Sequence, residues 1–186
     1  MTLKDATAFI MFRNNNPSPQ LWLDLGSGSG LFTLALAGNL PAGSKIIAID
    51  KDESALRKIP ATVNNVIIQT LAADFEGDGL DLKNVDGILM ANSLHYVRDK
   101  ETFLKKLVLS MKANGIFVIV EYDREATNQW VPYPLTIRAA KVLFKNLNYS
   151  DFHLLNKRRS AFGRYDMYAA IVSPGKIPAA VNGNVQ

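Results

Sequence analysis

The sequence predicts an α/β fold in which helices cover both faces of one mostly parallel β-sheet, a doubly wound sheet. Short runs rich in Val, Ile and Leu alternate along the chain with segments of helical character. A glycine-rich stretch directly follows the first of these runs, at the position where doubly wound sheets bind their ligands. The last two runs are too close together for an intervening helix, so their strands are expected to be antiparallel.

The first half of the chain is expected to supply three strands. Apolar residues at helical spacing predict an amphipathic helix that extends to Arg13, and the Asn- and Pro-containing residues 14–20 end it. The strands expected after it are 21–25, 45–50 and 65–70, and the helices that join them are 31–38 and 54–59. A loop is expected over 75–84.

The second half is expected to supply four more strands. These are 85–91, 116–122, 151–157 and 165–172, and the expected helices are 100–112 and 136–147. Asp99 fits the N-cap of the first of these helices, and Asn114-Gly115 is expected to end it. We therefore predict one domain over 1–172, with 1–20 as an N-terminal helix and linker, and a flexible tail over 173–186.

Composition limits the chemistry open to the chain. The absence of cysteine excludes disulfide bonds, thiolate metal sites and a cysteine nucleophile. His95 and His153 are the only histidines, too few for a histidine-rich zinc centre, and no metal site is predicted. The net charge of +4 permits an anionic partner without requiring one. No stretch reads as a secretory signal or a membrane span, so we expect a soluble, cytoplasmic protein with no membrane partner.

The glycine-rich stretch reads LWLDLGSGSG over residues 21–30. A dinucleotide fingerprint, G-x-G-x-x-G, would need a third glycine where Leu31 or Thr33 stands. The phosphate loop of nucleoside triphosphatases is absent, and a hydrolase elbow would need serine in place of Gly28. The pattern is therefore G-x-G-x-G, preceded by Asp24.

Five segments in order along the chain resemble the motifs of class I S-adenosylmethionine-dependent methyltransferases. They read LDLGSGSG, IIAID, LAADF, VDGILMANSLHYV and GIFVIVEYD. Together with the reversed final hairpin, they span about residues 20 to 172. The resemblance implies a seven-stranded sheet of order 3-2-1-4-5-7-6 with an antiparallel last strand, and S-adenosylmethionine as the methyl donor.

The resemblance assigns binding of S-adenosylmethionine to the residues at the ends of the first four strands. Asp24 is expected to face the ammonium group, Asp50 the ribose hydroxyls and Asp74 the adenine amino group. Asp24 could instead serve only as a cap, Asp50 only as a turn residue and Asp74 only as the start of a loop. The full set expected to contact the cofactor is Asp24, Gly26, Ser27, Gly28, Gly30, Asp50, Lys51, Ala73, Asp74, Phe75 and Asn92.

The methyl acceptor is expected beside the ends of the fourth and fifth strands. His95 is the candidate general base, with Tyr96 beside it, although a passively packed histidine is an equally simple interpretation. The segment NQWVPYPL over 128–135 could form an aromatic wall over the acceptor or attach the last helix to the sheet. The residues expected in the acceptor pocket are Ser93, His95, Tyr96, Glu121, Trp130 and Tyr133.

The predicted function is methyl transfer to a small-molecule acceptor by in-line displacement. One alternative is an RNA or protein methyltransferase that uses the basic run at 156–160, which could also be a solvated strand end. A second alternative is a non-catalytic subunit that binds S-adenosylmethionine. A nicotinamide-dependent oxidoreductase is a more distant third, because the dinucleotide fingerprint is incomplete.

Overall fold

The computed structural model describes residues 1–77, 82–160 and 165–175. The strands are β1 (Leu21–Leu25), β2 (Lys45–Asp50), β3 (Thr62–Val63), β4 (Val66–Ala72), β5 (Val85–Ala91), β6 (Met111–Asp123), β7 (Asp151–Arg159) and β8 (Asp166–Ser173). The helices are α1 (Leu3–Phe9), α2 (Leu31–Ala37), α3 (Glu53–Leu56), the short 3₁₀ helix η1 (Leu94–Tyr96), α4 (Lys100–Val108) and α5 (Ile137–Asn146).

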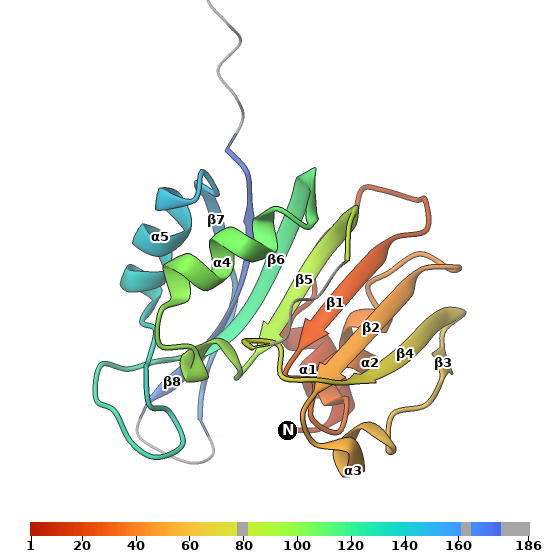
Figure 1. Cartoon of the computed structure of the whole chain (residues 1–186), viewed down its shortest axis with the longest axis horizontal. Helices are drawn as coiled ribbons and strands as arrows, with labels where there is room; N and C mark the ends of the chain where they lie inside the picture. Colours follow the sequence, from red (N-terminus) through yellow and green to blue (C-terminus); the bar gives the residue numbers. More distant parts are fainter. Residues whose placement is uncertain (78–81, 161–164, 176–186) are drawn as a thin grey trace, which may run out of the picture.

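All eight strands belong to one sheet, in the order β3-β4-β2-β1-β5-β6-β8-β7. The five strands from β4 to β6 are parallel, whereas β8 is antiparallel to both of its neighbours, β6 and β7. Figure 1 shows α4 and α5 in front of this sheet and α1 and α2 behind it. The predicted α/β class and the reversed final hairpin are therefore confirmed.

The predicted number of seven strands is wrong, because the sheet also contains β3. Its two residues pair in antiparallel fashion with the start of β4. Asn64 and Asn65 between them both have positive φ, +52° and +60°, as the tightest hairpin turns require. A strand of two residues carries no periodic pattern, so hydrophobic periodicity does not predict it. The seven longer strands follow the order 3-2-1-4-5-7-6.

Several helix and strand boundaries also differ from the predicted ones. Helix α4 ends at Val108 rather than at 112, and β6 begins at Met111 rather than at 116. The partner of β5 jumps from Met111 to Ile116 between Val85 and Gly87, so Asn114-Gly115 lies in a strand irregularity and not at a helix end. Parts of the predicted 75–84 loop, of the final hairpin turn and of the tail lie outside the described residues.

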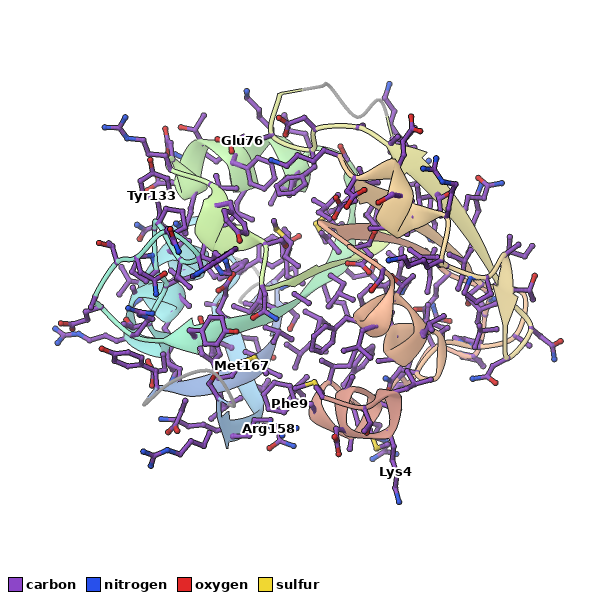
Figure 2. All side chains as sticks on the ribbon, turned by 90° about the horizontal axis from the view of Figure 1, so that it is seen from below. Lys4, Phe9, Glu76, Tyr133, Arg158 and Met167 are labelled. Carbon is purple, nitrogen blue, oxygen red and sulfur yellow. The ribbon has the colours of Figure 1, made fainter. Side chains whose placement is uncertain are left out.

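Side chains of the central strands alternate between two cores, one on each face of the sheet. On β1, Trp22 joins the core beneath α1 and α2, whereas Leu23 and Leu25 join the core beneath α4 and α5. Phe9 of α1 and Met167 of β8, labelled in Figure 2, belong to the first of these cores. A smaller cluster holds α3 against β2 and β4.

The carboxyl ends of the five parallel strands meet at one edge of the sheet, the lower edge in Figure 1. This is the edge where ligands bind in doubly wound folds, and the loops that follow β1, β2, β4, β5 and β6 all gather there. Within the described part of the chain, no helix is long and apolar enough to cross a lipid bilayer.

Gly87 in β5 is a position where the packed core leaves no room for a side chain. A Cβ atom there would lie 2.5 Å from the fully buried Trp22 ring. We expect Gly87→Ala to lower the free energy of unfolding by about 1–3 kcal/mol, because neither ring nor strand can move freely aside. Chemical denaturation measures this change. The control is Gly77→Ala, whose Cβ would find its nearest neighbour at 3.9 Å, and equal losses in both variants would contradict the packing argument.

Candidate functional site

The loop after β1 is held in place by backbone hydrogen bonds to β2 and by contact with the loop after β5. Gly26 and Ser27 donate their N–H groups to the Ile49 carbonyl oxygen, at 2.8 and 3.0 Å. Gly26 has φ +78°, and a Cβ on it would lie 2.5 Å from Cβ of Ser93 in the loop after β5. Gly26 therefore allows two loops to touch, which a residue with a side chain would prevent.

The other two glycines of the loop have different surroundings. Gly28 has φ +53°, and a Cβ on it would have no atom within 4 Å, so open space lies beside it. Gly30 is the N-cap of α2, and a Cβ there would lie 2.7 Å from the Ile59 side chain. Gly28 thus borders free volume, whereas Gly30 is required by packing within the protein.

Asp50 at the end of β2 accepts two backbone hydrogen bonds. Its Oδ2 accepts from the N–H of Gly28 at 2.7 Å, and its Oδ1 accepts from the N–H of Asp52 at 2.9 Å. These bonds fix the carboxylate at the border between the glycine loop and the β2–α3 turn. The side chain is only partly buried and lines the neighbouring cavity.

A cavity of about 530 Å³, here called the glycine-loop cavity, lies at this edge of the sheet. Its walls come from the ends of β1, β2, β4 and β5, and carboxylates predominate among its charged residues. The residues that line it are Gly26, Asp50, Lys51, Ala73, Asp74, Phe75, Glu76, Asn92, Ser93 and Tyr96. Figure 2 looks from this edge and shows Glu76 on the same side of the molecule as α4.

A second cavity of about 610 Å³, here called the aromatic cavity, adjoins the first. It lies between η1, the end of β6, the following loop and the β7–β8 hairpin. Its lining residues are Asn92, His95, Tyr96, Tyr122, Arg124, Asn128, Trp130, Val131, Ser160 and Tyr165. Asn92 and Tyr96 line both cavities and so form their common wall.

Asn92 combines two features that indicate a ligand site. Its φ of +55° lies in the left-handed region, and its N–H is fixed by the Val120 carbonyl at 2.8 Å. Its Oδ1 is buried without a hydrogen-bond partner. Buried polar atoms without partners are rare in proteins, and such an atom in a cavity wall is suited to accept a hydrogen bond from a ligand.

Unpartnered buried atoms cluster at this edge of the sheet. Asp24 Oδ1 and Ser27 Oγ, from the β1 end and the glycine loop, join Asn92 Oδ1 in having no hydrogen-bond partner. Arg124 Nε of the aromatic cavity is the fourth buried side-chain atom of this kind among the described residues. All four belong to the segments that build the two cavities.

The carboxyl group of Asp24 is fully buried. Its Oδ2 accepts a hydrogen bond from the Thr33 hydroxyl at 2.6 Å. Removal from water disfavours the ionised form and raises the pKa of Asp24 to about 7, although the Thr33 hydrogen bond acts in the opposite direction. A nearby cationic group would favour the ionised form and lower this pKa.

His95 and Glu121 form a buried pair at the wall of the aromatic cavity. Glu121 Oε1 accepts the backbone N–H of His95 at 3.0 Å, and Glu121 Oε2 lies 2.7 Å from His95 Nδ1. Both side chains are at most 2% exposed. With the Glu121 carboxyl group as the acceptor, Nδ1 donates the ring proton, and the neutral imidazole then has its lone pair on Nε2.

The segment after β6 covers the aromatic cavity. Asn128 Oδ1 accepts the N–H groups of Trp130 and Val131, at 3.0 and 2.7 Å, and forms a tight turn. Trp130 lines the cavity but is 69% exposed, so it stands at the cavity mouth. Tyr133 donates its N–H to the His95 carbonyl at 3.0 Å and places its ring 5.6 Å from Lys100 Nζ.

The residues predicted to form the acceptor pocket do not all line the same cavity. His95, Tyr96 and Trp130 line the aromatic cavity, whereas Ser93 lines only the glycine-loop cavity and donates its hydroxyl hydrogen to the Leu25 carbonyl at 2.6 Å. Glu121 and Tyr133 are not among the described residues that line these two cavities. Glu121 instead contacts His95.

The predicted cofactor residues divide in a similar way. Asn92 lines both cavities. Six other predicted cofactor residues line only the glycine-loop cavity: Gly26, Asp50, Lys51, Ala73, Asp74 and Phe75. Asp24, Ser27, Gly28 and Gly30 are not among the residues that line this cavity.

Among residues 1–77, 82–160 and 165–175, no group of three or more His, Asp or Glu side chains could hold a metal ion.

Sequence reasoning did not identify several residues that line the cavities. These are Glu76, Tyr122, Arg124, Asn128, Val131, Ser160 and Tyr165. The signal for Tyr122 and Arg124 is their place at the carboxyl end of β6, the edge at which doubly wound sheets bind ligands. Ser160 and Tyr165 are brought to the cavity by the final hairpin, which no local pattern indicates.

Comparisons with known proteins agree with this geometry. The family described as "Methyltransferase domain" matches residues 23–119, slightly more than half of the 186-residue chain. No curated protein sequence matches the chain. Among solved structures, the YcgJ protein from Bacillus subtilis matches with a TM-score of 0.66 and 12% identity, over 94% of this chain and 98% of that one.

Two further solved structures share the fold. The plantazolicin methyltransferase BpumL, in complex with SAH, matches with a TM-score of 0.62 and 14% identity, over 92% of this chain and 81% of that one. A Nostoc punctiforme PCC 73102 protein described as an O-methyltransferase matches with a TM-score of 0.64 and 17% identity, over 92% of this chain and 56% of that one. The chain thus spans little more than half the length of the Nostoc protein, and these low identities establish the fold alone.

The buried carboxyl of Asp24 predicts a pH dependence of stability. Its folded pKa of about 7 lies above the ordinary value of 3.8, so the folded chain retains a proton that the unfolded chain releases. The free energy of unfolding should therefore fall between about pH 4 and pH 7, with a contribution of up to about 1.4 kcal/mol per pH unit. Asp24→Asn should remove this contribution, as urea denaturation at several pH values would measure.

The control for this experiment is Glu125→Gln, at an exposed carboxyl. This variant should keep the wild-type slope. An Asp24→Asn variant whose stability changes with pH as steeply as that of the wild type would refute the assignment.

Proposed function

The chain belongs to the methyltransferase-domain family, and on that basis we propose that it transfers a methyl group from S-adenosylmethionine to a small-molecule acceptor. The observation that carries this proposal is the pair of adjoining cavities with a common wall at Asn92 and Tyr96. A transfer reaction needs a donor and an acceptor side by side, with the reacting atoms about 3–3.5 Å apart. Two adjoining cavities that share lining residues can hold a donor and an acceptor side by side.

The charges of the glycine-loop cavity favour this donor over a dinucleotide. Among the described residues, the carboxylates of Asp50, Asp74 and Glu76 line the cavity together with one cation, Lys51. S-adenosylmethionine carries an ammonium and a sulfonium against one carboxylate, so its net charge complements these walls. A dinucleotide would place an anionic pyrophosphate among the carboxylates, which is unfavourable.

Named groups of the chain are suited to each part of the donor. Asp50 at the end of β2 can accept hydrogen bonds from the ribose hydroxyls. Phe75 can pack against the adenine, next to Asp74. The open space beside Gly28 and the unpartnered oxygen of Asp24 suit the amino-acid end. When bound, S-adenosylmethionine supplies a methyl carbon that is already activated by its positive sulfur.

The remaining work of the protein is to orient the acceptor, exclude water and accept a proton where one is lost. The aromatic side chains around the second cavity supply apolar surface that would displace water when an acceptor is bound. Glu121 holds the His95 ring in the tautomer that leaves Nε2 basic. This pair therefore supports a role for His95 as general base rather than as passive packing.

Two observations support a small-molecule acceptor over the alternatives. Lys157 of the basic run is paired with Asp123 and Asp166, at 3.1 and 3.4 Å, which reduces the positive charge offered to a nucleic acid. The aromatic cavity, at about 610 Å³, has the volume of a small-molecule site and argues for an acceptor rather than for a non-catalytic subunit.

Titration calorimetry with S-adenosylhomocysteine, the demethylated product, tests the proposal. We expect saturable binding with one site per chain, and a higher melting temperature in its presence. NAD and NADP should produce neither effect. Binding of a nicotinamide dinucleotide in preference to S-adenosylhomocysteine would refute the proposal.

Replacement of Asp50 tests the ribose assignment. Asp50→Ala should weaken S-adenosylhomocysteine binding by on the order of 2–3 kcal/mol, because a charge-assisted contact is lost. Asp50→Asn, which keeps one acceptor oxygen, should weaken S-adenosylhomocysteine binding by a smaller amount. The matched control is Glu53→Ala, three residues further along at an exposed carboxylate that does not line the cavity. An unchanged affinity in Asp50→Ala would exclude this role.

A further inference from the structure

The two adjoining cavities differ in the sign of their charge. The glycine-loop cavity is lined by three carboxylates, whereas the described residues that line the aromatic cavity include no Asp or Glu. Among the described residues that line it, Arg124 is the one with a permanent charge. A cation in a partly enclosed site attracts an anionic ligand, and it repels a cationic one.

Arg124 is not neutralised by the described part of the protein. Its guanidinium lies 4.5 Å from the centroid of the Tyr165 ring, a cation–π contact, and none of the ion pairs among the described residues includes it. Its Nε is buried and has no hydrogen-bond partner. A buried donor without a partner is costly, and a carboxylate in the cavity would relieve that cost.

The same cavity contains a basic nitrogen. His95 lines the cavity, and its Nδ1 is occupied by Glu121 at 2.7 Å. Nε2 makes no hydrogen bond to any described residue, so it is available to a proton of a ligand. An imidazole in this tautomer can accept the proton of an acidic hydroxyl.

Between these two groups the lining is aromatic. Tyr96, Tyr122, Trp130 and Tyr165 all contribute to it. The His95 ring lies 4.5 Å from the Tyr96 ring and 6.2 Å from the Tyr122 ring, centroid to centroid. Aromatic walls of this kind favour a planar ligand through offset or edge-on ring contacts.

We propose that the methyl acceptor is a hydroxylated aromatic acid, whose carboxylate pairs with Arg124 and whose hydroxyl proton passes to His95 Nε2. This inference rests on the proposed function and names its acceptor class. The hydroxyl oxygen loses its proton to His95 and forms a bond to the methyl carbon. The bond between that carbon and the sulfur of S-adenosylmethionine breaks, and its electron pair stays on sulfur. The products are an aryl methyl ether and S-adenosylhomocysteine.

The binding experiment uses the full chain saturated with S-adenosylhomocysteine. The probes are 2-, 3- and 4-hydroxybenzoate, each compared by calorimetry with the neutral hydroxybenzamide of the same substitution. We expect at least one hydroxybenzoate to bind about tenfold or more tightly than its amide, since a charge-assisted pair with Arg124 is available only to the acid.

Arg124→Gln should remove this preference, because it should weaken the binding of the hydroxybenzoate and leave the binding of the hydroxybenzamide unchanged. The control Arg158→Gln alters an exposed arginine on β7 that does not line the cavity, and it should keep the preference. Equal binding of acid and amide, absence of binding by every probe, or an unchanged preference in Arg124→Gln would each overturn the proposal. S-adenosylhomocysteine binding in the same samples separates this failure from a failure of the proposed function.

A second measurement addresses His95. With a hydroxybenzoate that binds, His95→Gln should lower turnover at least tenfold and leave the affinity for S-adenosylhomocysteine within about twofold. Glu121→Gln should lower turnover less and shift its pH profile, because Glu121 acts through His95 as a positioning residue. Wild-type turnover in His95→Gln would show that the hydroxyl proton does not pass to this ring.

Discussion

The close approach of the loop after β1 to the loop after β5 determines where both cavities lie. Ser93 donates its hydroxyl hydrogen to the Leu25 carbonyl at 2.6 Å, and Gly26 packs directly against the Ser93 side chain. The same loop is joined to β2, because Gly26 and Ser27 both donate to the Ile49 carbonyl. Three adjacent strand ends are thus connected by neutral contacts. The charged and amide side chains that follow these strands remain available to line the cavity.

The arrangement of charge follows from this geometry. Carboxylates at the ends of β2 and β4 lie on one side of the common wall, and the arginine after β6 lies on the other. Under the proposed function, opposite potentials in adjoining sites would keep donor and acceptor from exchanging places, because each cavity would repel the charge that the other attracts. Asn92 and Tyr96, the residues of the wall, carry no formal charge and so do not favour either sign.

Much of the fold could be read from the sequence, because buried parallel strands leave strong local signals. The runs at β1, β2 and β5 were predicted to the residue, and so was the glycine loop between β1 and α2. β3 could not be predicted, since its two residues exist as a strand only through pairing with β4. The end of α4 was misjudged because Asn114-Gly115 resembles a helix stop but instead lies where β6 departs from regular pairing.

The site was predictable to the extent that its residues follow strands. Asp50, Asp74 and Asn92 do so, and they line the glycine-loop cavity. Arg124 and Tyr165 were missed because their meeting depends on the final hairpin folding back along β6, a contact between distant segments. The pairing of Glu121 with His95 likewise joins positions 26 residues apart, which no single-strand pattern encodes.

The turn closed by Asn128 has a consequence for how such a protein could diversify. The segment that covers the aromatic cavity is held by this turn and by the hydrogen bond from the Tyr133 N–H to the His95 carbonyl. Neither contact belongs to the hydrogen-bond pattern of the sheet. Exchanging Trp130, which is 69% exposed, removes little from either hydrophobic core. Under the proposed function, replacement of this exposed side chain would therefore change which acceptor binds without disturbing the sheet edge that holds the donor.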